Sequence, residues 1–311
     1  MVWLPSGYDD PSAAAHRWPV VVWLQGLVGQ VDMWDARKAF SPTFPERIDA
    51  LAPDCIVVLV DAWSSLGGAQ FLDSPAVGNY STYLCDDVVR WLDANYRTLP
   101  RPASRAVAGH SSGGYGAIVN AIARPDVWGH WISHAGDGLF EMSLWASVAD
   151  VVRTLARDHG GSYATFWEEV TASGRDLLSR DGDFPLLNMW CMAACFSPDP
   201  DEPSGVALPF DVRTGEQRAA VWSRWLAHDP VRMVRDPANA PAIESWRSAW
   251  VDAGTRDEVH ADLAAIALVD GLRAAGMGDD RLRFELHGGR HGGQDERFVA
   301  SLAWLAGRLS R

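Results

Sequence analysis

The sequence predicts an α/β fold, a doubly wound and mostly parallel sheet that carries a helical cap insertion. Short apolar runs alternate along the chain with segments in which apolar residues recur every three or four positions. Uninterrupted apolar runs are typical of strands buried on both faces, and this alternation is typical of parallel sheets. With 311 residues and 48% apolar composition, the chain is long enough to bury a large core.

Six segments have the pattern of buried strands. The first, WPVVVWLQG at 18–26, is a continuous apolar run that ends in the glycine. The other five predicted strands cover residues 55–63, 105–109, 129–136, 245–254 and 281–289. Because parallel strands end at the same edge of a sheet, we expect the loops that follow them to meet there.

Helical patterns separate these strands. Residues 83–96 place apolar side chains on one face, and residues 112–123 follow the third strand directly. A long amphipathic helix is predicted over 257–276, where Gly276 ends it. A last helix is predicted over 296–309, at the end of the chain.

Residues 138–245 break the alternation of strands and helices. The span is rich in tryptophan and in helical patterns, and a loop rich in Pro, Asp and Gly divides it at 197–211. We interpret the span as a helical cap over the carboxyl edge of the sheet, inserted between the fourth and fifth strands. Residues 1–137 and 246–311 then form the core domain.

The chain is acidic, which narrows the classes of partner. Its 27 basic and 40 acidic residues give a net charge of −13, and no basic run offsets it. Because a negative surface repels nucleic acids and anionic membranes, we expect neither as a partner. His134 and Asp137 lie close in sequence, but two residues do not make a metal site, so no metal or other cofactor is expected. A homodimer is compatible with the sequence.

The N-terminus and the cysteines indicate the cellular compartment in which we expect the protein. MVWLPSGYDD has no basic segment before an apolar run, and no stretch approaches the roughly 20 apolar residues of a membrane span, so we expect neither a signal peptide nor a membrane anchor. The four cysteines, which form no C-x-x-C pair and no zinc spacing, are Cys55, Cys85, Cys191 and Cys195. We expect them to be buried free thiols in a cytoplasmic protein.

The stretch AVAGHSSGGYGA contains the pattern G-x-S-x-G between a predicted strand and a predicted helix. This context is typical of the nucleophile elbow of α/β-hydrolases, in which small residues two positions before and after the nucleophile let strand and helix pack closely. Ser111 has Gly109 and Gly113 at those positions, whereas Ser112 would have His110 before it. Ser111 is therefore the predicted nucleophile.

A serine nucleophile needs a base, and the base needs an acid that orients it. In this fold the chain order is Ser, acid, His. His291 lies among glycines in the loop after the last predicted strand, where it can reach the carboxyl edge of the sheet. His287 stands at the end of that strand and is the alternative base, and either histidine could instead be structural.

The acid is expected in the loop after the fifth strand. Asp257 follows the turn at Gly254 and can face His291, although it could also cap the helix that begins there. Asp252, at the end of the strand, and Asp137, after the fourth strand, are the alternatives.

The same edge should supply an oxyanion hole. Its predicted donors are the backbone N–H groups of Leu27, in the loop after the first strand, and of Ser112. The candidate pocket residues around them are Gln25, His110, His134, Asp137, Trp145 and Trp190. We expect most cap tryptophans to be buried and a minority to bound an apolar pocket that favours short or compact acyl groups.

These motifs carry a family resemblance. The stretches VWLPSGYDD, PVVVWLQGLVGQVDMW, LDANYRT, AVAGHSSGGYGAI, WVDAGTRDEV and GGRHGG resemble the esterase D branch of the α/β-hydrolases, the "putative esterase" family. That family includes S-formylglutathione hydrolases, siderophore esterases and mycolyltransferases. The resemblance implies a triad of Ser111, Asp257 and His291. The sequence departs from the family at Gln25, where a histidine is more usual, and in its long tryptophan-rich insertion, so the resemblance does not identify a substrate.

We therefore expect a serine carboxylester hydrolase that forms an acyl-enzyme with a small or medium ester. An acyltransferase, which would pass the acyl group to an alcohol or an amine, is the alternative. A non-catalytic binding protein on the same scaffold is a remote alternative, because the predicted triad is intact.

Overall fold

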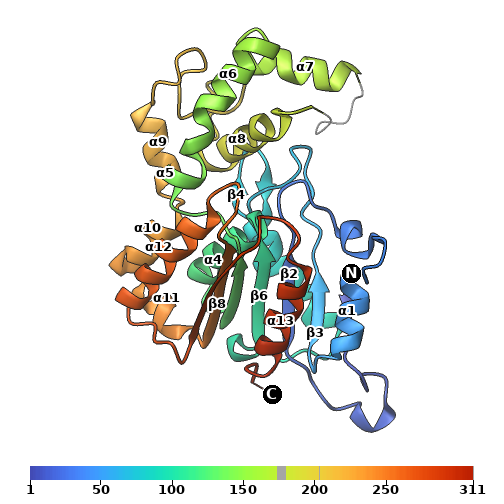
Figure 1. The fold of residues 1–311 in the computed structure, drawn as a ribbon. Helices are drawn as coiled ribbons and strands as arrows, with labels where there is room; N and C mark the ends of the chain where they lie inside the picture. Colours follow the sequence, from blue (N-terminus) through green and yellow to red (C-terminus); the bar gives the residue numbers. More distant parts are fainter. Residues whose placement is uncertain (174–179, 203, 311) are drawn as a thin grey trace.

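The computed structural model describes residues 1–173, 180–202 and 204–310, and a central sheet organises them (Figure 1). In this part of the chain the sheet has seven strands in the order β1-β3-β2-β6-β7-β8-β9. They are β1 (Val2–Trp3), β2 (Val20–Leu24), β3 (Ile56–Leu59), β6 (Arg105–His110), β7 (His130–His134), β8 (Ser248–Gly254) and β9 (Leu282–His287). All pairs are parallel except β1 with β3. The predicted parallel sheet is confirmed, and only the two-residue strand β1, too short to leave a pattern, was not expected.

Helices cover both faces of the sheet (Figure 1). On one face lie α3 (Val89–Asn95), α4 (Ser112–Ala123), α10 (Pro230–Arg235), α11 (Ala240–Ser245) and α12 (Ala261–Ala274). On the other lie α1 (Phe44–Leu51) and α13 (Asp295–Ala306). Strand β2 shows why both layers are needed, because all five of its residues are buried. Val22 and Leu24 face the α4 side, whereas Val21 and Trp23 face α1 and α13.

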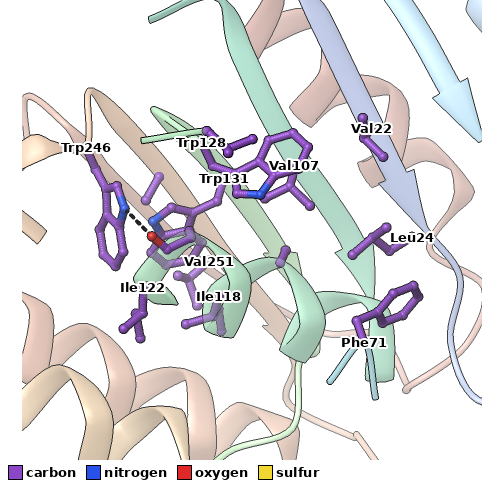
Figure 2. Close-up of a cluster of buried hydrophobic side chains, with 14 of the residues drawn as sticks. Val22, Leu24, Phe71, Val107, Ile118, Ile122, Trp128, Trp131, Trp246 and Val251 are labelled. Carbon is purple, nitrogen blue, oxygen red and sulfur yellow. Dashed lines mark hydrogen bonds between the residues drawn. The ribbon is translucent and has the colours of Figure 1, made fainter. Parts of the chain in front are cut away.

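Large aromatic side chains fill the core on the α4 side (Figure 2). Trp131 of β7 and Trp246, just before β8, lie edge to face with ring centroids 5.4 Å apart. The indole Nε1 of Trp246 donates a hydrogen bond to Ala121 O in α4 at 3.2 Å. Burial of such rings removes large apolar areas from water and fixes α4, which begins directly after Ser111, against the sheet.

Two predicted helices differ from the observed ones. Tyr83–Val88 forms a π-helical segment that leads into α3, so the predicted helix 83–96 is not α-helical throughout. Helix α12 begins at Ala261 rather than at residue 257, because His260 has a left-handed backbone (φ 60°). The residues before it, including Asp257, are thereby left in a loop.

Beyond the carboxyl ends of the strands, further helices form a separate layer (Figure 1). They are α5 (Phe140–Ser143), α6 (Val148–Asp158), α7 (Tyr163–Ser173), α8 (Asp183–Phe196) and α9 (Ala219–Leu226). Their apolar side chains form their own cluster, which meets the core at Tyr115 and Val119 of α4. Helices α10 and α11 instead pack with the core layer. The division into a core of 1–137 and 246–311 and a cap of 138–245 stays a prediction.

Shorter elements connect these layers. A two-stranded ribbon is formed by β4 (Asp73–Ser74) and β5 (Gly78–Asn79), and α2 (Tyr80–Thr82) follows it. All four cysteines are free and buried, as predicted. Among the residues that the structure describes, no helix combines the length and the apolar character needed to cross a membrane.

Candidate active site

Ser111 occupies a sharp turn between β6 and α4. Its backbone lies at φ 57° and ψ −123°, a conformation that L-residues rarely adopt, and its N–H donates to His134 O at 2.9 Å. The two glycines of the motif permit this turn. A Cβ on Gly109 would lie 2.5 Å from the carbonyl carbon of Gly113, and a Cβ on Gly113 would lie 2.3 Å from Leu24 O. The turn therefore has the features of a nucleophile elbow.

His291 brings its ring to this serine from the loop after β9. Its Nε2 lies 2.9 Å from Ser111 Oγ, and its Nδ1 lies 2.8 Å from Asp257 Oδ2. With the proton on Nδ1, the ring donates to Asp257, so Nε2 is free to accept the Ser111 proton. The structure thus brings together the three residues singled out from the sequence.

Asp257 is held in place by its own loop. Its second oxygen, Oδ1, accepts a hydrogen bond from Val259 N at 2.9 Å, and its side chain is completely buried. It does not cap α12, which begins four residues later. The loops after β8 and β9 approach closely at Gly254, where a Cβ would lie 2.3 Å from Gly289 O. This contact places Asp257 beside His291.

Three further contacts anchor the backbone of His291. Glu258 Oε2 accepts a hydrogen bond from His291 N at 3.0 Å, and Glu258 also pairs with Arg290. His110 Nε2 lies 2.8 Å from His291 O, which also accepts from the Gln294 amide at 3.0 Å. The sequence did not predict these anchors, although Glu258 directly follows Asp257 and His110 directly precedes Ser111.

The electrostatics favour His291 as a base. Burial alone would lower its pKa, but the hydrogen bond and charge of Asp257, with smaller effects of Asp137 and Glu258, raise the pKa above 6.5. His110 is different, since burial and the neighbouring His291 lower its pKa to about 3. His110 is therefore neutral and can donate Nε2–H to the His291 carbonyl.

The two predicted oxyanion donors are free to receive a ligand. Within the described residues, neither Leu27 N nor Ser112 N donates a hydrogen bond to another group. Gly26, next to Leu27, packs so closely that a Cβ would lie 3.2 Å from Ser111 Cβ. The hydroxyl of Ser112 is engaged elsewhere, because it accepts from Gln70 Nε2 at 2.7 Å.

Some predicted pocket residues have structural positions instead. Gln25 is buried, and its amide bridges to Val60 O (2.6 Å) and Ala62 N (2.8 Å), so it ties β2 to the segment after β3. His110 lines a cavity of about 190 Å³ that is bounded mainly by residues of the α1 and α13 side. These two side chains hold the loops around Ser111 and do not face the cap.

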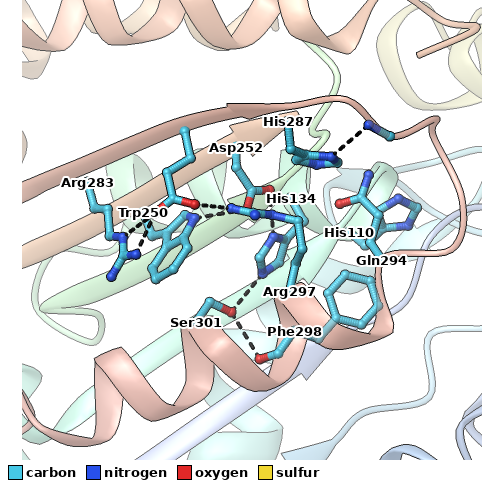
Figure 3. Close-up of polar contacts among 12 residues, drawn as sticks. His110, His134, Trp250, Asp252, Arg283, His287, Gln294, Arg297, Phe298 and Ser301 are labelled. Carbon is cyan, nitrogen blue, oxygen red and sulfur yellow. Dashed lines mark hydrogen bonds and ion pairs between the residues drawn. The ribbon is translucent and has the colours of Figure 1, made fainter. Parts of the chain in front are cut away.

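His134 is sealed in a polar network between the sheet and the α13 helix (Figure 3). Its Nδ1 lies 2.7 Å from Asp252 Oδ1, and its Nε2 lies 2.8 Å from Ser301 Oγ. Asp252 Oδ2 accepts from Arg297 Nε at 2.6 Å and from Trp250 Nε1 at 2.9 Å. His134 therefore offers no surface to a ligand, contrary to the expectation that it lines the pocket. Asp252 orients a different histidine from the one at Ser111.

The other candidates are distributed as follows. His287 accepts Gly289 N on its Nδ1 at 3.2 Å, so it is not the histidine at Ser111. Trp145 packs edge to face on Trp222. Trp190 lines a cavity of about 420 Å³ at the C-terminal half of α8. Among the described residues, Asp137 makes no hydrogen bond or ion pair, and the charges of His291 and Asp257 both act on its carboxyl group.

Taken together, the parallel sheet, the elbow serine, the acid-oriented histidine and the two N–H donors that stay unengaged within the described residues form the arrangement that α/β-hydrolases use. The family model described as Putative esterase matches residues 1–298, and the chain belongs to that family.

Individual relatives are more distant. An esterase of Mycobacterium tuberculosis is 29% identical over 132 residues, which cover 39% of this chain and 27% of the relative. The S-formylglutathione hydrolase of Mus musculus is 27% identical over 131 residues, which cover 38% of this chain and 46% of the relative. The chain thus spans less than half the length of either curated relative. A solved ferulic acid esterase has the same fold, with a TM-score of 0.61 at 17% identity over 99% of this chain and 91% of its own.

Proposed function

We propose that the protein is a serine carboxylester hydrolase that works through an acyl-enzyme on small or medium esters. The observation that carries the proposal is the continuous hydrogen-bonded series from Asp257 through His291 to Ser111, beside two unengaged N–H groups. Membership of the esterase family supports the same class of reaction.

The geometry accounts for each step of such a reaction. Ser111 Oγ attacks the ester carbonyl as His291 Nε2 takes its proton. The oxyanion that develops accepts hydrogen bonds from Leu27 N and Ser112 N, which no other described group engages. His291 then gives the proton to the departing alcohol, and a water molecule that His291 deprotonates releases the acid from Ser111.

Exposure of the base favours water over another alcohol as the second nucleophile. The side chain of His291 keeps 23% of its surface exposed, so water reaches the group that must deprotonate it. An acyltransferase would gain from excluding water at this point. We therefore place hydrolysis ahead of transfer.

A cavity between the cap helices and the Asp257 loop is the candidate binding space. Its volume is about 240 Å³, and residues of α5, α6, α8 and the loop after β8 line it, including Ser143, Phe184, Asn188 and Val259. A space of this size suits a small or medium ester rather than a long lipid chain.

The experiment is a panel of aryl esters of increasing acyl length, assayed with the wild type and with Ser111→Ala. We expect Ser111-dependent turnover that is fastest for short acyl groups, with a burst of the aryl alcohol if deacylation limits the rate. Turnover that survives in Ser111→Ala would refute the proposal. Competition between water and added alcohol, with both products measured, separates hydrolysis from acyl transfer.

A further inference from the structure

Asp137 is a buried carboxyl group that the proposed reaction does not use. It follows β7 and retains 9% of its surface. Within residues 1–173, 180–202 and 204–310, its side chain makes no hydrogen bond and no ion pair. Buried carboxyl groups are normally paired or hydrogen-bonded, so an unbonded one calls for a partner from outside the chain.

The loop that carries Asp137 is held on both sides, so the side chain cannot find a partner by backbone movement at low cost. Ala135 N donates to Asp252 O at 2.7 Å, and Gly138 O accepts from Ser143 Oγ at 2.8 Å. Gly136 packs on the start of α4, where a Cβ would lie 2.9 Å from the carbonyl carbon of Gly114. The backbone that carries the carboxyl group is therefore fixed in place.

The loop that carries Asp137 adjoins the nucleophile turn. Ser111 N donates to His134 O at 2.9 Å, three residues before Asp137, and the charges of His291 and Asp257 both act on the Asp137 carboxyl group. It does not orient the imidazole, since Asp257 occupies His291 Nδ1. The candidate binding cavity adjoins the same two loops, because its wall residues Ser143 and Val259 bond to Gly138 and Asp257.

The surroundings of Asp137 favour a cation. Among the described residues, the cavity wall carries the carboxyl groups of Asp150 and Glu258, one histidine, His260, and neither lysine nor arginine. The nearby Arg290 is already paired with Glu258. An anionic substrate would meet two carboxylates and no described lysine or arginine on this wall, whereas an ammonium group could form charge-assisted hydrogen bonds with the Asp137 carboxylate.

We propose that Asp137 is a specificity-determining residue that binds a protonated amine of the substrate, carried close to the ester carbonyl. The proposal rests on the proposed function of Ser111 and names the class of ester that this site prefers. The proposal also predicts that this protein hydrolyses strongly anionic esters or thioesters poorly.

The test uses two pairs of esters that differ only in the cation. In the first pair, ethyl alaninate carries an ammonium group on the acyl side where ethyl isobutyrate carries a methyl group. In the second pair, dimethylaminoethyl propanoate carries a protonated amine on the alcohol side where isopentyl propanoate carries a neutral branched carbon. At pH 7 we expect wild-type kcat/KM to favour the ammonium ester of at least one pair by about ten- to hundredfold, and Asp137→Asn to reduce that ratio to about one. The pair that responds identifies the side of the ester that Asp137 faces.

The controls separate a binding role from a structural one. Asp270→Asn removes the same charge from an exposed position on α12 and should leave both ratios unchanged. Labelling of Ser111 by a fluorophosphonate checks that the triad is assembled in Asp137→Asn. An Asp137→Asn enzyme that slows both members of a pair equally, or a wild type with no preference for either ammonium ester, overturns the proposal. A preference for neutral ethyl lactate over ethyl alaninate also overturns it.

A pH profile gives a second readout. Burial raises the pKa of Asp137 to about 6, with His291 opposing and Asp257 reinforcing that shift. The preference should therefore disappear below about pH 6, although protonation of His291 slows both esters of a pair equally and leaves the ratio unaffected. If Ser111→Ala hydrolyses these esters as fast as the wild type, the proposed function fails. If hydrolysis depends on Ser111 but no ratio responds to Asp137, only this inference fails.

Discussion

The molecule contains two Ser–His–Asp series with nearly the same distances. At the carboxyl edge, Ser111, His291 and Asp257 are joined at 2.9 and 2.8 Å. Beneath α13, Ser301, His134 and Asp252 are joined at 2.8 and 2.7 Å (Figure 3). By distances alone, the two cannot be told apart.

Their surroundings differ in every respect that catalysis requires. Ser301 lies within α13, is completely buried, and also contacts Phe298 O at 3.1 Å. His134 and Asp252 are likewise sealed, and Arg297 pairs with the carboxylate. Ser111 instead stands on a strained turn beside free N–H donors, and its histidine reaches solvent. The comparison teaches that access, oxyanion donors and the backbone turn, rather than hydrogen-bond distances, make Ser111 and not Ser301 the candidate nucleophile.

Replacing each serine by alanine should give the largest difference between the two series. Ser111→Ala should lower kcat by roughly 10⁴–10⁶, because only binding and the oxyanion donors then remain. Ser301→Ala should retain the activity and lose about 1–3 kcal/mol of stability, since a buried nitrogen of His134 loses its partner. Aryl ester hydrolysis and denaturant unfolding measure the two effects. Loss of activity in Ser301→Ala, in a folded protein, would contradict the distinction.

The two acids should separate in the same way. Asp257→Asn should reduce kcat by about 10⁴ at neutral pH, because an amide favours the wrong tautomer of His291. Asp252→Asn should keep most of the activity but cost about 3–5 kcal/mol, because Arg297 and His134 lose a buried partner. Activity per folded molecule, with the folded fraction from circular dichroism, distinguishes them. Full activity in Asp257→Asn would move the acid to another residue.

The third candidate acid, Asp137, should not be needed for the reaction itself, so Asp137→Asn should keep most of its activity on neutral esters.

The pH dependence should report only the exposed series. Because Asp257 raises the pKa of His291 above 6.5, kcat/KM should rise with pH to a half-maximum above pH 6.5. The sign for stability is opposite, since a raised histidine pKa contributes stability that is present below pH 6.5 and is lost as pH rises through the folded pKa. A half-maximum well below pH 6.5 would contradict the Asp257–His291 interaction.

Removal of the Asp137 charge should stabilise the fold, as expected for a group kept for binding. Burial raises its pKa to about 6, so stability from this group is present below about pH 4 and is lost as pH rises to about 6. Asp137→Asn should therefore be more stable than the wild type at pH 8, on the order of 1–3 kcal/mol, with the difference vanishing below pH 4. Urea unfolding at both pH values tests this, and equal stability at pH 8 would show that the carboxylate has a partner in the free protein.

The smallest effect on catalysis is expected at Ser112. Only its backbone N–H faces the oxyanion, so Ser112→Ala should change kcat by less than about tenfold. The variant should still lose about 1–3 kcal/mol of stability, because Gln70 Nε2 loses its acceptor in a buried place. An inactive Ser112→Ala beside an active Ser111→Ala would reverse the assignment of the nucleophile.

Much of the fold and the position of the elbow turn followed from local sequence. The uninterrupted runs at β2 and β3 predicted buried parallel strands, because no side of such a run tolerates water. The choice of Ser111 over Ser112 needed only the glycines two residues away. Steric demands at an elbow act over a few residues, so sequence alone was sufficient there.

The remaining parts of the site depend on contacts between distant segments. His291 and Ser111 are 180 residues apart, and His134 and Asp252 are 118 apart. The sequence made His134 and Asp137 equally good candidates for the pocket. In the structure His134 is sealed against α13, whereas Asp137 makes no hydrogen bond within the described residues. The anchors at Gln70 and Glu258 were not predicted, because nothing in the sequence indicates which hydroxyl or N–H they meet.

By itself, the sequence determined the sheet and the position of the elbow, because these depend on backbone sterics and on apolar periodicity within short segments. It also predicted His291 and Asp257 as partners of Ser111, but left His287, Asp252 and Asp137 open. Only the tertiary structure showed which of these groups contact Ser111 and which form a structural network. The physical reason is that burial, hydrogen-bond geometry and access to solvent arise where distant loops converge, and the same residue types can then serve either role.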